Sequence, residues 1–184
     1  MEFEVLDTNQ LQLRRFDQDA LDFAFTNLED AEHLQFLGLN DVQALAEEKR
    51  RYKGGYSTFN KSFLYFHLIL KERNEVIGWC GFHTWYTDHH RAEIGYGIYK
   101  DEFKKQGFMT EALEAVLEYG FENMKLNRVE ALIAEYNIPS LKLLQRFNFQ
   151  KEGVLRAHYY VDGIAEDSSM YALLSEDWAA KALN

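Results

Sequence analysis

The sequence is poor in cysteine and proline, with one of each in 184 residues. The single cysteine, Cys80, excludes an intramolecular disulfide, as is usual in a reducing compartment. No apolar run is long enough for a membrane span, and the chain lacks the pattern of a signal peptide. We therefore expect a cytoplasmic protein with no membrane partner. Because glycine is modest and Pro139 stands alone, no stretch resembles a linker, and we expect a single domain over residues 1–184.

Basic residues are also in the minority: 20 Lys and Arg accompany 30 Asp and Glu, which gives a formal net charge of -10. An acidic surface repels phosphates, so we expect no nucleic-acid partner. The charge suits a cationic substrate such as an amine, and it equally suits an acidic protein with no such preference. Asp88, His89 and His90 are adjacent in a loop, but neighbouring histidines point apart and no partner motif accompanies them. We expect no metal.

Apolar residues make up 47% of the chain and aromatic residues 15%, which is enough for a sizeable core. Alternating or continuous apolar runs predict strands, and helical periodicity after capping residues predicts helices. The expected strands are 11–16, 62–70, 76–85, 92–99, 128–134, 149–161 and 164–174. The expected helices run from Asp17 or Asp19 to about Asn27, and over 30–37, 40–55, 109–123, 138–147 and 175–183. For the helix over 40–55 we expect Asn40 or Asp41 as the cap and Gly54 or Gly55 as the end.

The order of these elements predicts an α+β fold around one mixed sheet. Three successive strands between residues 62 and 99 have short links, which favours antiparallel pairing. The strand–helix–strand passage from 92 to 134 predicts a parallel pair at the sheet centre. Asp162 and Gly163 predict a two-residue hairpin between the last two strands.

The stretch FKKQGFMTEAL, residues 103–113, predicts a strand-to-helix turn that binds a ligand. Amides at a helix start lack intrahelical partners and carry positive partial charge, so such a turn suits an anion, most naturally phosphate. Gly107 permits close approach of the ligand, while Lys104 and Lys105 add positive charge. A helix start with solvated lysines explains the same residues.

A second strand-to-helix turn follows strand 128–134. Asn137 and Ser140 lie three residues apart at the start of the next helix, where they serve equally well as helix caps. Lys142 and Arg146 lie four residues apart and so share one helix face. Two neighbouring parallel strands that both end at helix starts predict a ligand site in a mixed sheet.

With these residues identified, the chain resembles the GNAT superfamily of acetyl-CoA-dependent N-acetyltransferases, and within it the Rim-type branch that acetylates the N-termini of ribosomal proteins. The similarity covers essentially the whole chain and is densest from residue 74 to 178. It implies the GNAT fold, a mostly antiparallel twisted sheet with a splayed parallel pair and flanking helices. The segments that carry it are AEIGY (92–96), KKQGFMTEA (104–112), NRV (127–129), NIPS (137–140), FQKEG (149–153) and DG (162–163) with Asp167.

The resemblance implies acetyl-CoA as the co-substrate and no metal. The family's pyrophosphate loop, Gln/Arg-x-x-Gly-x-Gly/Ala, corresponds to Lys104, Gly107 and Met109; the lysine and the methionine depart from the commonest residues. The end of strand 92–99 would pair with the pantetheine arm, and Asn137 would bond to it. The expected cofactor-binding residues are Ile98, Tyr99, Lys104, Lys105, Gln106, Gly107, Phe108, Met109, Thr110, Asn137, Lys142 and Arg146.

The implied reaction is direct attack of an amine on the acetyl carbonyl. Glu93 stands where several family members place a base, although a surface carboxylate on an alternating strand is an equal interpretation. Ser140 matches the position of the proposed acid for the thiolate in Rim-type enzymes. Those enzymes also use a carboxylate on the strand after Gly153, where this chain reads AHYY at 157–160 and has no acid. The residues expected to contact the acceptor are Phe36, Tyr96, Tyr159 and Tyr160.

The pKa of the amine favours one acceptor class. At neutral pH, deprotonation costs roughly 4–5 kcal/mol for a lysine amine of pKa ~10.4 and about 1–1.5 kcal/mol for an α-amine of pKa ~8. A site without one well-matched base therefore favours a protein or peptide N-terminus. A small-molecule amine (an antibiotic, a polyamine or an amino acid) and a catalytically silent acyl-CoA-binding module are the alternatives. A homodimer is a further expectation.

Overall fold

The computed structural model describes residues 3–55 and 62–181, and for Lys181 the backbone alone. Its strands are β1 (Val5–Asp7), β2 (Leu11–Phe16), β3 (Ser62–Leu70), β4 (Glu75–Tyr86), β5 (Arg91–Ile98), β6 (Arg128–Ile133), β7 (Gln150–Val161) and β8 (Ile164–Leu174). Its helices are α1 (Gln18–Asn27), α2 (Asp30–Leu37), α3 (Val42–Gly54), α4 (Phe108–Glu122), α5 (Ile138–Arg146) and α6 (Ser175–Lys181), with 3₁₀ turns η1 (Thr87–His89) and η2 (Asp101–Phe103).

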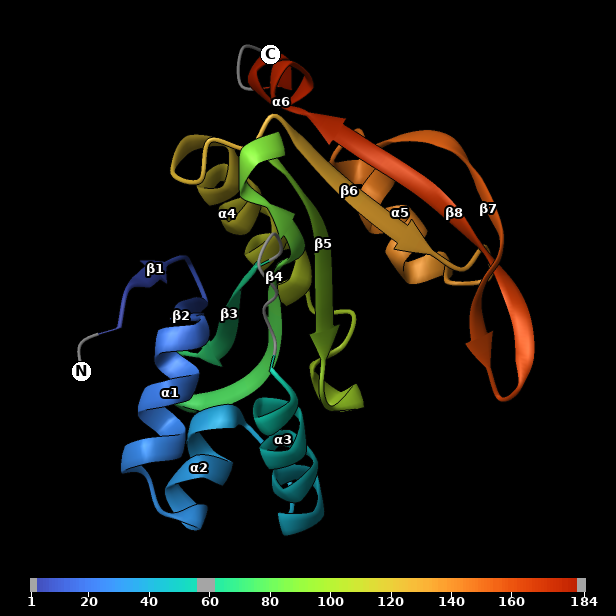
Figure 1. Ribbon diagram of the computed structural model, residues 1–184. Helices are drawn as coiled ribbons and strands as arrows, with labels where there is room; N and C mark the ends of the chain where they lie inside the picture. The colour runs from blue at the N-terminus through green and yellow to red at the C-terminus, as the bar shows by residue number, and fades with distance from the viewer. Residues whose placement is uncertain (1–2, 56–61, 182–184) are drawn as a thin grey trace.

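The strands form one eight-stranded sheet in the order β1-β2-β3-β4-β5-β6-β8-β7. Only β5 and β6 run parallel among these neighbours, and they pair over residues 91–93 and 128–130. Beyond Glu93 the two strands diverge, which leaves the open V between β5 and β6 in Figure 1. The predicted α+β sheet with a splayed parallel pair is confirmed.

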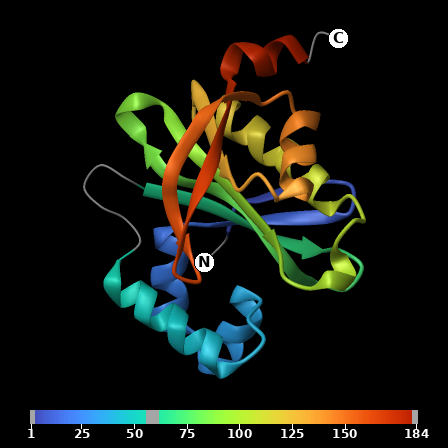
Figure 2. The same cartoon turned by 90° about the vertical axis from the view of Figure 1, so that its right-hand side faces the viewer.

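The side chains of β5 point alternately to the two sides of the sheet. Ala92 and Ile94 are buried in the larger core, together with Val116 of α4 and Leu144 of α5. Glu93 therefore faces the opposite side, where α1, α2 and α3 pack over β2 and β3 around a smaller core. Figure 2 shows these two groups of helices on the two sides of the sheet.

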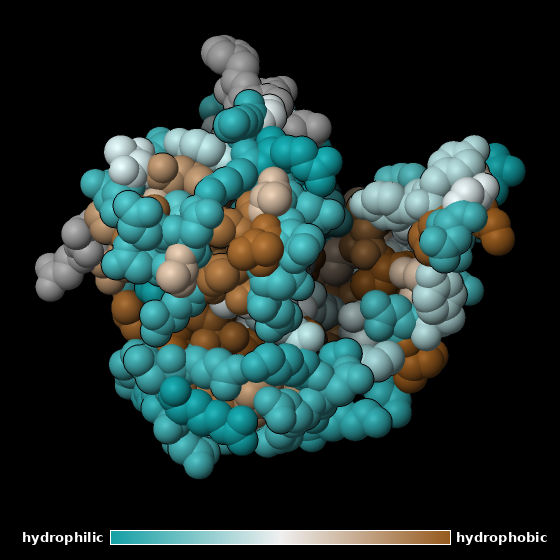
Figure 3. All heavy atoms as spheres, turned by 90° about the horizontal axis from the view of Figure 1, so that it is seen from below, coloured by the Kyte–Doolittle hydropathy of each residue, from teal (hydrophilic) through white to brown (hydrophobic). Residues whose placement is uncertain are grey.

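The hairpin of β7 and β8 forms an arm that extends away from the rest of the sheet (Figure 1). Every residue of β7 is exposed. The predicted turn is confirmed, because Val161 pairs with Ile164 across Asp162 and Gly163, both of which have positive φ. Figure 3 shows a deep hollow between this arm and the body of the molecule. The arm therefore supplies one wall of an open space rather than a packed face.

Capping residues locate the helix starts as predicted. Asp17 accepts a hydrogen bond from the amide of Ala20 at the start of α1, and Asp41 accepts one from Ala44 at the start of α3. Gly55, with φ 81°, ends α3. The predicted helix 175–183 is described only as far as residue 181; its last two residues lie outside the described part of the chain.

The strand β1 was not predicted from the sequence, because three residues carry too little periodicity. It pairs with β2, and the link between them is fixed by Glu111 of α4. The Glu111 carboxylate accepts hydrogen bonds of 2.6 Å from both the Thr8 hydroxyl and the Gln10 amide. This contact fastens α4 to the edge of the sheet.

No helix within residues 3–55 and 62–181 is long and apolar enough to cross a membrane.

Candidate active site

A cleft of about 430 Å³ lies on the α4 and α5 side of the sheet, where β5 and β6 separate. The end of β5, the turn before α4 and the start of α5 wall it. Both strand-to-helix turns singled out in the sequence therefore meet at one cavity. Its lining residues are Tyr96, Gly97, Ile98, Phe103, Lys104, Lys105, Gln106, Gly107, Phe108, Met109, Thr110, Asn137, Pro139, Ser140 and Leu143.

The backbone of the turn before α4 provides the anion-binding part of this cleft. The first helical bond runs from the Glu111 amide to the Gly107 carbonyl, so the amides of residues 105–110 donate to no backbone carbonyl among the described residues. Gly107 is the N-cap with φ 87°, and a Cβ placed there would meet no atom within 4 Å. The left-handed backbone favours glycine at this position, and the open space in front of it leaves room for a ligand to approach the backbone. A row of free amides facing open space suits a pyrophosphate.

The lysines of the turn are not equivalent. The ammonium of Lys104 lies 2.6 Å from a carboxylate oxygen of Asp101. Lys105 forms no ion pair with any residue that the structure describes. Gln106 donates to the carbonyl of Glu102 and fixes the turn from outside. Lys105 is the cation of this turn that is free to meet a phosphate.

Glu93 occupies the last paired position of β5, on the side of the sheet opposite the cleft. Its carboxylate lies 3.7 Å from His83 Nδ1, and 14% of the side chain is exposed. Burial, and next the charge of Glu130, raise the pKa of Glu93 to about 7. Burial lowers the pKa of His83, so the histidine is neutral and the pair is not an ion pair near neutral pH. A carboxylate with this pKa can accept a proton at physiological pH.

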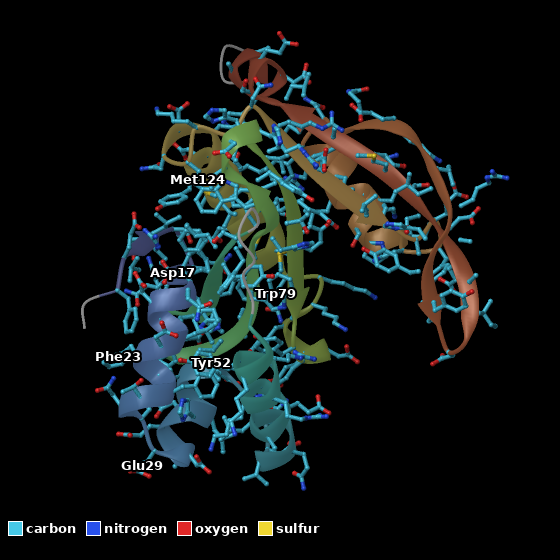
Figure 4. The ribbon with its side chains drawn as sticks, in the orientation of Figure 1. Asp17, Phe23, Glu29, Tyr52, Trp79 and Met124 are labelled. Atoms are coloured by element: carbon cyan, nitrogen blue, oxygen red, sulfur yellow. The ribbon has the colours of Figure 1, made fainter. Side chains whose placement is uncertain are left out.

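Aromatic rings cover the sheet beside Glu93. A Cβ at Gly95 would lie 2.8 Å from the Trp79 ring, and one at Gly97 would lie 3.2 Å from Trp79 Nε1. Both glycines therefore make room for the indole to lie across the splayed part of β5. Figure 4 labels Trp79 on the part of the sheet that lies above α3. The Tyr65 ring packs against Trp79 with centroids 4.9 Å apart. The result is an aromatic floor beside one carboxylate.

The arm brings one predicted acceptor residue to this region. Tyr159 is 50% exposed, and after burial the charge of Glu93 is the cause that raises its pKa. Its hydroxyl therefore lies near enough to feel the carboxylate across the hollow. Tyr160 is 77% exposed. Of the two arm tyrosines expected at the acceptor, Tyr159 faces the side of the hollow where Glu93 lies, and its contact with an acceptor stays a prediction.

Asn137 and Ser140 meet at the start of α5. The Asn137 side chain accepts a hydrogen bond of 3.3 Å from the Ser140 amide, which confirms the helix cap. Both residues also line the cleft, so capping and ligand contact are compatible. The side chain of Ser140 lies beside the hydroxyl of Tyr96 and acts to lower its pKa, although burial, the larger cause, raises that pKa to about 12.

Tyr96 differs from the expectation that it contacts the acceptor. It shares the orientation of Ala92 and Ile94, packs against the larger core and lines the cleft beside Ser140. The alternation along β5 is the physical reason, since residues an even number apart face the same side. Tyr96 therefore belongs to the cleft side of the sheet, whereas Glu93, Gly95 and Gly97 face the aromatic floor. The predicted contact of Tyr96 with the acceptor stays a prediction.

Several other expected site residues lie outside the cleft. Lys142 and Arg146 are exposed on α5 and do not line it. Tyr99 lines a separate cavity together with Gly38 and Val76. Phe36 packs in the smaller core, with its ring 4.0 Å below the guanidinium of Arg14. For these four residues the predicted contacts with cofactor or acceptor stay predictions.

Sequence reasoning missed His83, Trp79 and Tyr65 beside Glu93. The available signal was the spacing of Gly95 and Gly97, which leaves a side-chain-free stripe on one side of β5. Its significance depends on the register of β4 against β5, where His83 pairs with Glu93 and Trp79 with Gly97. The described residues contain no group of three or more His, Cys, Asp or Glu placed to hold a metal.

The residues present fit acetyl-CoA. Free amides and an unpaired lysine face the cleft at the place expected for the pyrophosphate. Beyond Glu93 the edge of β5 toward β6 has no strand partner among the described residues, so it can pair with an extended amide-containing arm. Tyr96 also lines the cleft, and its buried hydroxyl has no hydrogen-bond partner among the residues that the structure describes.

Curated relatives of this chain carry the name of an acyl-transfer enzyme. It is 43% identical over 114 residues to the uncharacterized N-acetyltransferase p20 of Bacillus licheniformis, an alignment that covers 62% of this chain and 64% of the relative. It is 32% identical to the uncharacterized N-acetyltransferase YoaA of Bacillus subtilis over 94% of this chain and 97% of the relative. It is 31% identical to the ribosomal protein uS5-alanine N-acetyltransferase of Escherichia coli over 68% of this chain and 66% of the relative.

A solved structure and a family model point to the same kind of protein as these relatives. The spermidine/spermine N-acetyltransferase SpeG of Vibrio cholerae aligns with a TM-score of 0.69 at 18% identity, over 94% of this chain and 98% of that chain, a likeness that shows the fold alone. Residues 10–150 match the model described as an acetyltransferase (GNAT) domain. The match includes the whole turn before α4, Glu93 and Ser140. This chain belongs to the GNAT acetyltransferase family.

Proposed function

We propose that this chain transfers an acetyl group from acetyl-CoA to a primary amine, and that its acceptor is the α-amine of a protein or peptide N-terminus. Glu93 is the observation that carries this proposal. It lies at the vertex of the splayed strands, between the cleft on one side and the open aromatic floor on the other, with a pKa of about 7. A base at this vertex can meet an amine that arrives from the floor.

Acetyl-CoA, when bound, supplies the acetyl group as an activated thioester. The free amides of residues 105–110 and Lys105 bind its pyrophosphate, and the open edge of β5 aligns its pantetheine arm. Glu93 accepts the proton that the attacking amine loses, and burial beside Trp79 excludes water from the carboxylate. Ser140, at the inner end of the cleft, donates a hydrogen bond toward the departing sulfur.

The pKa of Glu93 favours an α-amine over a lysine side chain. Proton transfer to a base of pKa about 7 is uphill by roughly 1.4 kcal/mol from an α-amine of pKa ~8 and by roughly 4–5 kcal/mol from a lysine of pKa ~10.4. The relative in Escherichia coli that is named for the alanine of ribosomal protein uS5 supports the same class. The open hollow beside the arm also admits the end of a chain (Figure 3).

A small polyamine is the second candidate, and the net charge of -10 favours it. The V. cholerae relative by fold is named for spermidine and spermine. A panel of acceptors in a thiol-release assay separates the candidates. We expect the kcat/KM for peptides that copy ribosomal-protein N-termini to exceed that for spermidine and for lysine by at least about tenfold. Equal or greater kcat/KM for spermidine would overturn the N-terminal acceptor, and the absence of thiol release with intact acetyl-CoA binding would favour a silent acyl-CoA-binding module.

A further inference from the structure

The hydroxyl of Tyr96 is a buried polar group without a hydrogen-bond partner. Its oxygen is shielded from solvent and bonds to no described residue. Cys80 is its register partner on β4, and Ser140 lies beside it on α5, near enough for its side chain to act as a hydrogen-bonding neighbour that lowers the pKa of Tyr96. Even so, no hydrogen bond of ordinary geometry joins the Tyr96 hydroxyl to either residue. An unsatisfied buried hydroxyl costs about 1–3 kcal/mol, so such groups are rare and call for a reason.

The position of Tyr96 suggests the reason. Its side chain lines the cleft, three residues beyond Glu93 on β5 and on the other side of the sheet. The hydroxyl of Ser140 lines the same cleft and also forms no hydrogen bond to a described residue. Two hydroxyls side by side, neither of them satisfied by the protein, point to one acceptor atom of a ligand.

We propose that Tyr96 and Ser140 together donate hydrogen bonds to the sulfur of CoA as it leaves, so that Tyr96 stabilises the developing thiolate. This inference rests on the proposed acetyl transfer. In that reaction a carbon–nitrogen bond forms, the carbon–sulfur bond breaks with its electron pair going to sulfur, and Glu93 takes the proton from nitrogen. The negative charge on sulfur then needs donors, and the inner end of the cleft has these two.

Tyr96 acts as a hydrogen-bond donor and keeps its proton. Burial raises its pKa to about 12, whereas an ordinary thiol has a pKa of about 8.5. Transfer of the tyrosine proton to the thiolate would therefore be strongly uphill, while a hydrogen bond to the thiolate is favourable. A neutral thioester sulfur is a weak acceptor, so the bond strengthens as charge develops, which is the condition for an effect on kcat rather than on KM.

The test compares Tyr96→Phe with a matched tyrosine. Tyr119 on α4 is also buried, but its hydroxyl donates a 2.9 Å hydrogen bond to Glu4 and lies outside the cleft. Each variant is titrated by calorimetry at about pH 9.5, where the thiol of CoA is mostly ionised, with CoA and with desulfo-CoA, the analogue in which hydrogen replaces the thiol. We expect Tyr96→Phe to weaken CoA by about fivefold or more and to leave desulfo-CoA within twofold, because only the sulfur contact is lost. Tyr119→Phe should change neither affinity.

Thermal unfolding distinguishes this role of the Tyr96 hydroxyl from a structural one, because the two roles predict opposite changes in Tm. Removal of an unsatisfied hydroxyl should leave the Tm of Tyr96→Phe unchanged or higher, while Tyr119→Phe should lower it. In turnover we expect kcat to fall about 10- to 100-fold for Tyr96→Phe, with the KM for acetyl-CoA within about twofold. Ser140→Ala should give the same selective loss for CoA over desulfo-CoA.

Two results would overturn the inference while the proposed function stands. One is an equal loss of CoA and desulfo-CoA affinity in Tyr96→Phe, or no loss of either. The other is a fall in its Tm like that of Tyr119→Phe, which would show that the hydroxyl has a structural partner. If the wild-type protein binds neither ligand, the proposed function itself fails, and this outcome is distinct because it appears before any variant is made.

Discussion

The two sides of the splayed sheet use different parts of the chain. On the cleft side, the surface that we propose for acetyl-CoA is mostly backbone: the amides of residues 105–110, the left-handed Gly107 and the open edge of β5. On the opposite side, the surface consists of side chains, with Glu93, His83 and Trp79 within one patch. A single strand, β5, serves both sides through alternate residues.

This difference determines how each side tolerates change. Backbone amides are present whatever the side chain, so we expect the cleft to bind acetyl-CoA although Lys104 and Met109 depart from the family's commonest residues. On the acceptor side, each substitution changes the chemistry that the substrate meets. The comparison therefore predicts that single side-chain changes have their largest effects at Glu93, and that cleft variants are severe only where they alter the backbone.

The largest effect should come from Glu93→Gln. Loss of the base should lower kcat by about 100-fold, the lower end of the range for general base catalysis. In the wild type, kcat/KM should fall about tenfold per pH unit below a pKa of about 7, since only the ionised carboxylate accepts a proton. Initial rates of thiol release between pH 5.5 and 8.5 measure both. Glu118→Gln, on the exposed face of α4, is the control; an unchanged rate in Glu93→Gln would remove the base assignment.

The next effect should come from Gly107→Val, which alters the backbone of the cleft. A β-branched residue at φ 87° is strained, and its side chain would occupy the space in front of the amides. We expect the KM for acetyl-CoA to rise about 10- to 30-fold, with a smaller change in kcat. Gly163→Val is the matched control, because Gly163 has φ 81° and open space around its Cβ, but lies at the tip of the arm. Equal KM values for the two variants would show that strain alone is responsible.

The free energy of unfolding should depend on pH because the Glu93 carboxylate is costly to bury in its charged form. Its pKa is about 7 when folded and near 4.5 when unfolded, so between these values the folded state holds a proton that the unfolded state has lost. Stability should therefore decrease as pH rises from about 4.5 to about 7 and then stay constant. The full difference would be roughly 3 kcal/mol; we expect about 1–2 kcal/mol, because 14% of the side chain is exposed.

Denaturant titrations of Glu93→Gln check this expectation. At pH 8 the variant should be more stable than the wild type by about 1–2 kcal/mol. Its free energy of unfolding should not show the decrease between pH 4.5 and 7 that is expected for the wild type. The same substitution thus lowers activity and raises stability, as is common where a site holds an unfavourable charge. A variant that is less stable than the wild type at pH 8 would contradict the raised pKa.

The same comparison explains what the sequence could predict. Helix starts are local, so Asp17, Asp41 and Asn137 were identified from capping chemistry, and the turn at Gly107 from its missing helix partners. The parallel pair followed from the handedness of a strand–helix–strand unit. The cleft is assembled from these local features. Many of the residues that line it, among them Ile98, Gly107 and Asn137, were therefore already among those expected to bind the cofactor.

The acceptor side depends on contacts that no local pattern contains. Which β4 side chains stand beside Glu93 is set by the register across the loop 87–90, and this register shifts between His83 and Tyr86. Phe36 was expected at the acceptor, but α2 folds back and places its ring over Arg14 in the smaller core. Tyr96 was expected at the acceptor, but the side of the sheet that it faces depends on the alternation along β5, which places it on the cleft side.

The smallest effect should separate two lysines that the sequence treated alike. Lys105 lines the cleft without an ion-pair partner, whereas Lys142 is exposed on α5 outside it. A solvated lysine meets a phosphate as a screened point charge worth about 0.2–1 kcal/mol, so Lys105→Ala should raise the KM for acetyl-CoA by about two- to fivefold, and less at high salt. Lys142→Ala should leave it unchanged. If Lys142→Ala has the larger effect, the cofactor extends over α5, and the cleft described here is only the inner part of its site.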